Sequence, residues 1–599
     1  MRFPTNQQSR RRRERWRIRR GSIYVMTLGT AMIVAVLGLA GLMIVRVQRL
    51  QIDTGIDMRN AQSYAKAALD MAWHRVQNDS SWRSKMDSGT WATDQAIGDG
   101  FYSFTATDPV DGNLTDSDYD PVVVVGVGKS GNTTQKHQME IRALQPGIRC
   151  LEPVLHAEKN LTFDGGTVTG DRMVSANDKA EMKNSAQVYA DAEAQNDVAT
   201  SSGGVWHGST TTAGTWPRQM PNIVTLYSYY TANGTTINYS DLPDWDANQI
   251  DNPGGEDATT SPWYGVSCTI SKSSVQKKSG ISSIWCSNRN SVGDYLAQDV
   301  TSKLESGITY YTEVQVRTST DEDVDYTVKL KVVSTGSGTL YFNLTNTDET
   351  DDSWKTLSGT QTVTWNGSLT QAELYVGSSS SSYSYYVDDV VMRDDNAPSD
   401  VKVIHRMLLS PASNPFGFGV ANSQGIYVID CGGDKISIKN SRIVGTLVLL
   451  NQNEGDSEIA GSMHWAPAVV SADPTVTNLP ALLSNKKLNL YFTNTALNEG
   501  LVNANFNPTG TKYNDSQDSD KSDTYPSVME GLIYSEKAII ALNQPTISGV
   551  LVGHDDIDVT NATLTLKYNP LYFERNAPPG FQAATTYYIL PDSYRQVVD

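Results

Sequence analysis

An uncharged apolar run over residues 21–45 divides the chain into two chemically different parts. It reads GSIYVMTLGTAMIVAVLGLAGLMIV, and at about 1.5 Å per helical residue it exceeds the ~30 Å hydrocarbon core of a bilayer. Arginines crowd the segment from Arg10 to Arg20, whereas the sequence after Arg46 is polar, acidic and rich in turn residues. By the positive-inside rule, this asymmetry keeps the N-terminus in the cytoplasm. The run therefore predicts a single-pass anchor with the remaining domains on the far side of the membrane.

A cleavable secretory signal is the alternative interpretation of the apolar run. Such signals have a shorter apolar region that ends in a small-residue cleavage site. Here Arg46 and Arg49 follow the run, and no A-x-A pattern closes it. The uncleaved anchor is therefore favoured, with residues 1–20 as a basic cytoplasmic leader and residues 21–45 as the transmembrane helix.

After the anchor, small and apolar residues recur at spacings of three and four, which is typical of one helix face. They are Met58, Ala61, Ala65, Ala68, Leu69, Ala72 and Val76. We therefore expect an amphipathic stalk helix over residues 46–80, with Gly55 as a flexible point. The alternative is a juxtamembrane helix that packs on its own ectodomain.

The N-terminal region resembles a known family. A basic leader that ends in Gly21, an apolar helix and the segment RNAQSYAKAAL (59–69) are similar to type IV pilus and pseudopilus proteins, most closely the PilX-type minor pilins. The resemblance implies cleavage by a prepilin peptidase between Gly21 and Ser22, a bacterial inner-membrane location, and pilus or type II secretion subunits as partners. Mature major pilins usually carry glutamate at their fifth residue, where this chain has Met26.

Composition limits the remaining function classes. Of the 599 residues, 19% are charged and 39% are hydrophobic, so the ectodomain can bury several cores. The formal net charge is −18 even though the leader is strongly basic. Nucleic-acid binding needs basic stripes against phosphate, so an acidic exterior argues against it.

Three stretches of the ectodomain read as β-structure. Residues 99–145 predict a small antiparallel region, because short alternating strings are separated by turns that contain Gly or Asp. Residues 150–245 and 400–570 share short β strings with polar corners, which favours a discontinuous domain like a β-solenoid, a parallel β-helix. The period is not strict, so an irregular sandwich remains the alternative. Residues 571–599 are interpreted as a C-terminal tail.

Residues 250–393 have a different character. They open with NPGGED (252–257), continue through GDYLAQDVT, SGITYYTEVQVRT, DSWKTLSGTQTVTW and AELYVG, and close with SYYVDDVVM (384–392). This order of motifs resembles the carbohydrate-binding modules of families 4 and 9, which are β-sandwich jelly rolls. In the strand 311–317, odd-numbered residues face one way and Thr312, Val314 and Val316 the other, as a sandwich requires. We therefore predict a jelly roll inserted into the solenoid.

Binding residues follow from sugar chemistry and from the resemblance. Sugar rings stack on aromatic faces, so the carbohydrate-binding candidates are Trp263, Tyr264, Tyr295 and Trp354. The alternative fate of each aromatic residue is burial in the core. The resemblance also implies a structural Ca²⁺ held by Glu256 with Asp388 or Asp389, and carboxylate oxygens suit that ion.

The four cysteines are Cys150, Cys268, Cys286 and Cys431. No C-x-x-C pair exists, so a zinc site is not expected. Cys268 and Cys286 lie symmetrically about Lys277 in a predicted hairpin, which makes them a disulfide candidate in an oxidising compartment. Two buried thiols are the alternative, and the states of Cys150 and Cys431 stay open.

The predicted fold class is mainly β with an N-terminal transmembrane helix, and a β-solenoid-like ectodomain interrupted by a jelly roll. No catalytic motif or placeable carboxylate pair is present, so the chain is not expected to be an enzyme. We interpret it as a membrane-anchored, pilin-like protein whose ectodomain, in the periplasm or at the cell surface, binds polysaccharide for adhesion or assembly. The alternatives are a membrane-tethered polysaccharide lyase or glycosidase, and a purely structural protein.

Overall fold

The computed structural model describes residues 20–597 apart from 86–89, 111, 116–119, 145, 213–215, 382, 472, 474–475 and 575. The chain divides into two compact units, one of residues 1–143 and 586–599 and the other of residues 144–585. The predicted basic leader, except for its last residue, lies outside the described residues.

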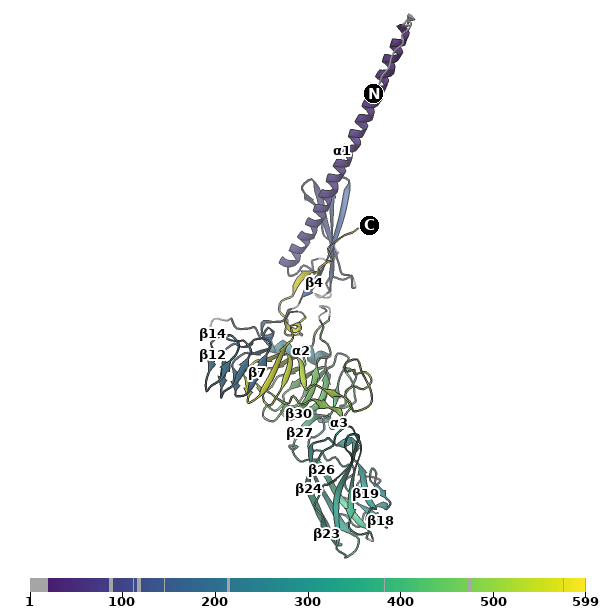
Figure 1. The fold of residues 1–599 in the computed structure, drawn as a ribbon, viewed down its shortest axis with the longest axis vertical. Helices are drawn as coiled ribbons and strands as arrows, with labels where there is room; N and C mark the ends of the chain where they lie inside the picture. The colour runs from purple at the N-terminus through teal and green to yellow at the C-terminus, as the bar shows by residue number, and fades with distance from the viewer. Residues whose placement is uncertain are drawn as a thin grey trace, which may run out of the picture. The chain divides into compact units, whose positions relative to one another are not determined.

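One helix, α1 (Arg20–Asn78), contains both the apolar run and the stalk (Figure 1). It continues through Gly55 without a break. Large apolar side chains from Ile23 to Met58 are exposed. The helix is long and apolar enough to cross a membrane, a property that anchors and signal sequences share.

The stalk part of α1 packs on its own small sheet through the predicted small-residue face. The buried members of that face are Ala61, Ala65, Ala68, Leu69, Ala72 and Val76. Glycine in the sheet permits the close approach, since a Cβ at Gly128 would lie 2.0 Å from the Ala61 carbonyl oxygen. This is the alternative arrangement considered for the stalk, a helix that covers its own ectodomain.

The small sheet is antiparallel and includes the C-terminal residues. Its strand order is β1-β2-β3-β4-β42, and β43 also pairs with β4. The strands are β1 (Thr90–Ile97), β2 (Gly100–Thr107), β3 (Val122–Ser130), β4 (Thr133–Leu144), β42 (Thr586–Ile589) and β43 (Arg595–Gln596). The expectation that residues 571–599 form a tail is wrong for the residues of β42 and β43, because their backbones pair with β4.

A parallel sheet of 24 strands forms the second unit's solenoid. Its first part comprises β5 (Leu155–Ala157), β6 (Leu161–Asp164), β7 (Thr167–Gly170), β8 (Val174–Ala176), β9 (Lys179–Lys183), β10 (Gln187–Tyr189), β11 (Ala192–Ala194), β12 (Asp197–Thr200), β13 (Val205–Trp206), β14 (Thr210–Thr212) and β15 (Thr235–Thr236). Its second part comprises β27 (Val401–His405), β28 (Leu408–Leu409), β29 (Ile426–Asp430), β30 (Lys435–Val444), β31 (Thr446–Leu450), β32 (Glu458–Ala466), β33 (Leu482–Ser484), β34 (Leu488–Phe492), β37 (Val528–Ser535), β38 (Ile539–Ala541), β39 (Thr546–Gly553), β40 (Ile557–Thr560) and β41 (Thr563–Tyr568).

The two parts form one continuous stack of coils. Strands β5, β6 and β7 pair on one side with β8, β9 and β10, the next coil along the chain. On the other side they pair with β39, β40 and β41, the last coil of the second part. Inward residues such as Ile436, Ile438 and Ile443 fill a single apolar core. The predicted solenoid is therefore confirmed, and its earliest coils stack on its latest.

A second apolar layer covers one face of the solenoid. It contains η1 (Arg149–Leu151), α2 (Ile223–Asn233) and α4 (Leu571–Glu574). Buried residues of this layer include Cys150, Leu226 and Tyr230, which pack against outward residues of the coils such as Val448. The remaining short helices are η2 (Tyr239–Asp241), η3 (Thr301–Lys303) and α3 (Glu499–Val502), and a two-stranded ribbon joins β35 (Leu497–Asn498) to β36 (Thr524–Tyr525).

The predicted sandwich lies between the two parts of the solenoid sequence (teal in Figure 1). One sheet has the order β16-β19-β25-β21-β22, with β23 on β21, and the other β17-β18-β26-β20-β24. The strands are β16 (Tyr264–Val266), β17 (Thr269–Ser273), β18 (Ser283–Ser287), β19 (Tyr295–Asp299), β20 (Ile308–Thr318), β21 (Val324–Ser334), β22 (Gly338–Asn343), β23 (Asp348–Thr350), β24 (Lys355–Val363), β25 (Leu369–Ser378) and β26 (Tyr385–Asp394). Thr312, Val314 and Val316 face the buried interior as predicted.

Candidate functional site

Tyrosines gather on the outward face of the sheet that contains β16, β19 and β25. Antiparallel pairing sets Tyr264 beside Ala297, and Ala297 beside Tyr375. The Tyr295 ring stacks on Tyr375, with the ring centroids 4.3 Å apart and the planes 27° from parallel. Further across the sheet Tyr341 is 64% exposed. Three neighbouring strands and β22 thus present aromatic side chains to solvent on one surface.

Charged and amide side chains lie among these rings. The Tyr264 hydroxyl donates a hydrogen bond to Glu373 Oε1 at 2.6 Å, and Lys331 Nζ donates to Glu373 Oε2 at 2.9 Å. Lys331 Nζ also lies 3.3 Å from Gln371 Oε1. We call the outward residues Tyr264, Tyr295, Tyr341, Tyr375, Glu373, Lys331 and Gln371 the tyrosine face.

The hydrogen bonds of the tyrosine face favour an ionised Glu373 and an ionised Lys331 near neutral pH. Partial burial pushes the pKa of Glu373 up, but the hydrogen bonds from Tyr264 and Lys331 outweigh that effect and lower it overall. The bond to Glu373 raises the pKa of Lys331. Partial burial and the same carboxylate raise the pKa of Tyr264 and Tyr295. A carboxylate, an ammonium group and neutral hydroxyls are therefore available to hydrogen-bond a ligand.

The structure brings together only part of the predicted binding set. Tyr264 and Tyr295 lie on the tyrosine face. Trp263 is 3% exposed and its indole N–H donates to the Asn252 carbonyl, so it offers no free ring face and the prediction for it is wrong. Trp354 lies in the loop before β24, which belongs to the other sheet.

Sequence reasoning missed five residues of the tyrosine face: Tyr341, Tyr375, Glu373, Lys331 and Gln371. A signal for two of them was present, because Glu373 and Tyr375 alternate within AELYVG as the outward positions of a strand. Their proximity to Tyr264 and Tyr295 depends on which strands pair, and alternation alone does not specify that.

The residues proposed for Ca²⁺ do converge. Glu256 accepts hydrogen bonds from the Ile281 and Ser282 amides, and the fully buried Asp388 accepts them from the amides of residues 278 and 279. A Cβ placed on Gly254 would lie 2.4 Å from Asp388 Oδ1 and 3.4 Å from Glu256 Oε1, so glycine leaves a small space that both carboxylates border.

The charge balance of this space fits a cation. Burial raises the pKa of Asp388, and no ion pair of the described residues neutralises either carboxylate. Asp389 is turned to Ser279, whose hydroxyl donates to Asp389 Oδ1 at 2.6 Å. Glu256 and Asp388, with main-chain oxygens near Gly254, would be the residues that hold the ion.

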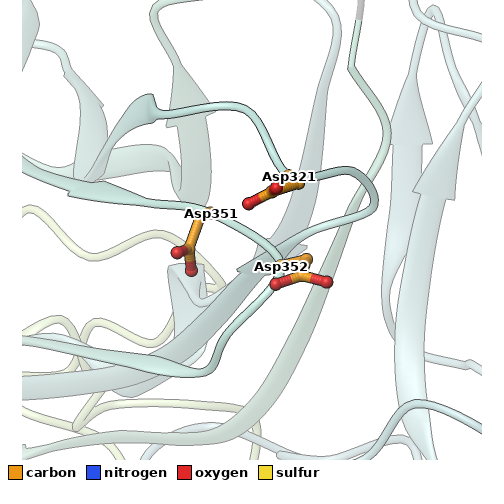
Figure 2. A group of neighbouring side chains, drawn as sticks. All are labelled: Asp321, Asp351 and Asp352. Carbon is orange, nitrogen blue, oxygen red and sulfur yellow. The ribbon is translucent and has the colours of Figure 1, made fainter.

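A second carboxylate group lies in the loops at the β23 end of the sandwich (Figure 2). Oxygens of Asp321, Asp351 and Asp352 all lie within 4.8 Å of one another. Asp351 accepts from the Ser353 amide at 2.8 Å, and Arg317 lies 3.7 Å from Asp352. Local hydrogen bonds and a nearby guanidinium account for this exposed cluster, so we assign it no ligand.

Cys268 and Cys286 meet as expected, with their sulfur atoms 3.1 Å apart as two thiols. The hairpin register pairs Ile270 with Cys286, so the cysteines are offset diagonally by two positions. The hydrogen bond from Cys286 lowers the pKa of Cys268, and a thiolate is the form that reacts with oxidants.

Oxidation is expected to join Cys268 to Cys286 and to leave the other two cysteines as thiols. Burial raises the pKa of Cys150, and it raises that of Cys431 to about 12, which suppresses their reaction. Closing a loop of this size should add about 3 kcal/mol to the free energy of unfolding. Differential alkylation with peptide mass spectrometry, together with denaturant unfolding, checks both statements. Alkylation of all four cysteines after oxidation would contradict them.

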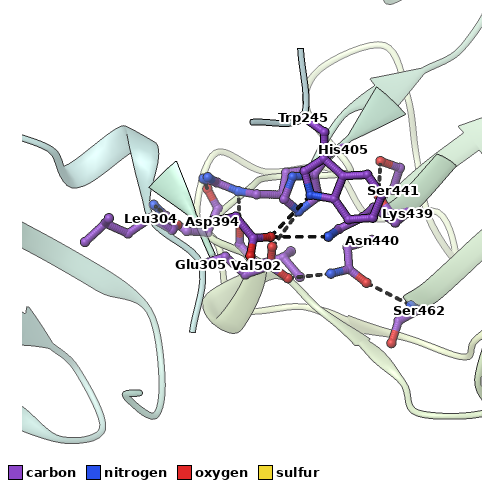
Figure 3. Close-up of polar contacts among 12 residues, drawn as sticks. Trp245, Leu304, Glu305, Asp394, His405, Lys439, Asn440, Ser441, Ser462 and Val502 are labelled. Carbon is purple, nitrogen blue, oxygen red and sulfur yellow. Dashed lines mark hydrogen bonds and ion pairs between the residues drawn. The ribbon is translucent and has the colours of Figure 1, made fainter. Parts of the chain in front are cut away.

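The sandwich is joined to the solenoid by a buried polar network (Figure 3). Glu305, after η3, lies 2.5 Å from His405 Nε2 at the end of β27. The Asn440 side chain of β30 donates to Glu305 Oε1 and accepts from the Ser462 amide at 2.8 Å. Glu305 is 5% exposed, so its charge depends on these partners.

Two cations complete this junction. Lys439 lies 3.7 Å from Asp394 and 4.0 Å from the centre of the Trp245 ring. Arg406 donates to the carbonyls of Lys303 at 2.9 Å and of Val502. Because these contacts come from both domains, they set the orientation of the sandwich on its support.

A sandwich face with half-buried and exposed tyrosines beside hydrogen-bonding side chains suits a sugar, because the rings offer an apolar surface and the polar groups fix the ligand's orientation. Residues 247–382 match the model of the family CBM_4_9, described as carbohydrate binding domain. The chain therefore contains a carbohydrate-binding module in this segment.

Solved structures that are similar to about a quarter of the chain have low identity. The CBM22-1 xylan-binding domain from Paenibacillus barcinonensis Xyn10C is 15% identical, with a TM-score of 0.24 and coverage of 25% of this chain and 96% of that one. The C-terminal family 22 carbohydrate binding module of Clostridium thermocellum Xyn10B is 18% identical, with a TM-score of 0.22 and coverage of 26% and 99%. No curated protein matches the chain at a significant level.

Proposed function

We propose that this protein is membrane-anchored and holds a polysaccharide-binding module on a β-solenoid support, for adhesion or assembly. The observation that carries the proposal is the tyrosine face on a segment that matches a carbohydrate-binding family. Stacked rings supply an apolar platform, and Glu373, Lys331 and Gln371 supply the polar contacts that orient a sugar.

Replacing Tyr295 with alanine is expected to weaken saccharide binding by about 2 kcal/mol, roughly 30-fold in Kd, because it removes an aromatic anchor and its stacking partner's support. A glycan array identifies a ligand, and calorimetric titration measures the change. Tyr386→Ala is the matched control, since Tyr386 stacks on Trp285 on the opposite sheet. Equal losses in both variants, or no loss in Tyr295→Ala, would rule out the tyrosine face.

The anchoring part of the proposal rests on α1. Its exposed apolar side chains fit a bilayer or the apolar core of a helical assembly, and the basic leader favours a cytoplasmic N-terminus. A pilin-like role adds cleavage between Gly21 and Ser22, with pilus or type II secretion subunits as partners. N-terminal sequencing of the mature protein tests this role: a start at Ser22 supports it, and a start at Met1 contradicts it.

We propose binding without chemical turnover. Glu373 lies beside the exposed Asp299 of the neighbouring strand β19, whereas glycoside cleavage uses two carboxylates that face each other across a cleft. A reducing-sugar release assay on each array ligand separates binding from cleavage. Release of sugar by the purified protein would favour the tethered-enzyme alternative.

Ca²⁺ is proposed to stabilise the module through Glu256 and Asp388. Ca²⁺ at a concentration of about 100 times its Kd should add about 2.7 kcal/mol to the free energy of unfolding. Asp388→Asn should abolish that gain, whereas Asp351→Asn, in the exposed acidic cluster, should retain it. Thermal unfolding with Ca²⁺ or with chelator measures the difference, and an identical response of the two variants would sink the assignment.

A further inference from the structure

A notch opens at one corner of the solenoid, where β7, β10 and β13 turn into the next strand of each coil. Its volume is about 280 Å³, and it is bordered by Asp171, Arg172, Tyr189, Asp191, His207 and Gly208. None of these residues belongs to the module or to its junction. We call this pocket the corner notch.

Aromatic rings form one wall of the corner notch. Parallel pairing sets Val188 beside Trp206, so the next residues, Tyr189 and His207, lie one above the other. Their ring centroids are 4.0 Å apart and their planes differ by 1°. Tyr189 is 45% exposed, and Gln187 holds the His207 ring through a 2.9 Å contact to Nε2. The wall is therefore a stacked pair of aromatic rings that is open to solvent.

Polar groups with spare capacity face the same space. Asp191 Oδ1 accepts from the amide and hydroxyl of Ser209, and Asp171 Oδ1 accepts from the Tyr568 amide. In the part of the chain that the structure describes, the second oxygen of each carboxylate has no recorded donor. The Arg172 guanidinium lies 4.6 Å from the centre of the Tyr568 ring, which fixes its position while leaving its N–H groups available.

We propose that the corner notch is a second saccharide-binding site, on the solenoid, that takes a neutral sugar unit. Its chemistry repeats that of the tyrosine face: a stacked aromatic pair beside a carboxylate and a cation. Two carboxylates against one guanidinium repel uronates and sulfated sugars, so the ligand class is a neutral, hydroxyl-rich glycan. This proposal rests on the proposed function only for the class of ligand. With two saccharide sites, the protein could bind one glycan chain at both sites or two separate glycan chains.

The test uses the full chain and calorimetric titration with neutral β-1,4-linked hexasaccharides of xylose, glucose and mannose, with polygalacturonate as the acidic comparison. The wild-type protein is expected to bind a neutral hexasaccharide at two sites. Tyr189→Ala combined with Asp191→Asn should remove one of these sites, and Tyr295→Ala should weaken the other by roughly 30-fold in Kd. If the double variant fails to fold, Asp191→Asn alone provides the test. This variant preserves the shape of the side chain and should weaken binding at the corner notch at least tenfold.

Failure of the two sites can be told apart. Loss of all binding in Tyr295→Ala alone, an unchanged site count in the notch variants, or no binding of any neutral hexasaccharide would overturn the notch. Preference for polygalacturonate would also overturn it. Binding that survives Tyr295→Ala and disappears in the notch variants would support the notch while contradicting the tyrosine face.

Discussion

Glu305→Ala is expected to lower the free energy of unfolding by about 3 to 5 kcal/mol, among the largest losses for a single side chain. Glu305 is buried between His405 and Asn440, with Arg406 and Lys439 nearby. Burial pushes its pKa up, but the His405 hydrogen bond and the two cations outweigh that effect and lower it overall. Removing the carboxylate leaves the buried Asn440 donor unpaired and takes from Arg406 the anion that raises its pKa, while Lys439 keeps Asp394. Denaturant unfolding of the purified protein measures the loss.

The matched control is Asp348→Ala. Asp348 pairs with Lys355 at 3.2 Å on the same module, but both side chains are about half exposed, so the pair should contribute less than about 1 kcal/mol. The loss of unfolding free energy in Glu305→Gln should lie between the losses in Glu305→Ala and Asp348→Ala, because glutamine keeps the shape of the side chain and removes its charge. A loss in Glu305→Ala no greater than in Asp348→Ala would mean that the junction network is not stabilising.

The junction also links stability to function. The sandwich and the solenoid have separate cores, so the contacts between them, which are the junction and the hydrogen bonds from the α3 region to Trp365 and Thr301, make them unfold together. In calorimetry, the sandwich and the solenoid of the wild-type protein should unfold in one transition. In Glu305→Ala, the two domains should unfold in separate transitions. A loosened module would still bind sugar through the tyrosine face, but its direction relative to the solenoid would vary.

Local patterns in the sequence predicted the elements better than their contacts. The spacing of Ala61, Ala65 and Ala68 predicts the buried face of α1, and the alternation around Val314 predicts the buried face of β20. Both follow from the period of one helix or one strand. The module's two ends, which carry Glu256 and Asp388, likewise converge as the family resemblance implied.

The remaining contacts depend on topology. Tyr375 reaches Tyr295 only because β25 pairs with β19, and Glu305 reaches Asn440 across 135 residues of sequence. Trp263 shows the opposite failure: its aromatic ring made it a candidate for stacking on a sugar, but the Asn252 carbonyl holds its indole inside the module. Aromatic residue type alone therefore could not separate a binding ring from a core ring.

Acidification from pH 7 to pH 4 is expected to destabilise the solenoid by several kcal/mol, mainly through buried histidines. His156 is fully buried beside Ser175, and burial lowers its pKa to about 3; burial lowers that of His464 to about 4. Burial also lowers the pKa of His405, more than Glu305 raises it. An unfolded histidine takes up a proton below about pH 6.5, whereas these folded rings do not. The stabilisation is thus complete above pH 6.5 and is lost as pH falls toward 4.

The slope of unfolding free energy against pH isolates the contribution of His156. Each ring that protonates only in the unfolded state adds about 1.4 kcal/mol per pH unit between the two pKa values. His156→Gln should reduce the slope by that amount between pH 6 and pH 4, whatever its effect on stability at pH 7. His207→Gln, at an exposed position of the same solenoid, is the matched variant for the loss of an imidazole. If the slope is the same in wild type and His156→Gln, the prediction is wrong. That result would mean that His156 takes up its proton as readily in the folded state as in the unfolded state.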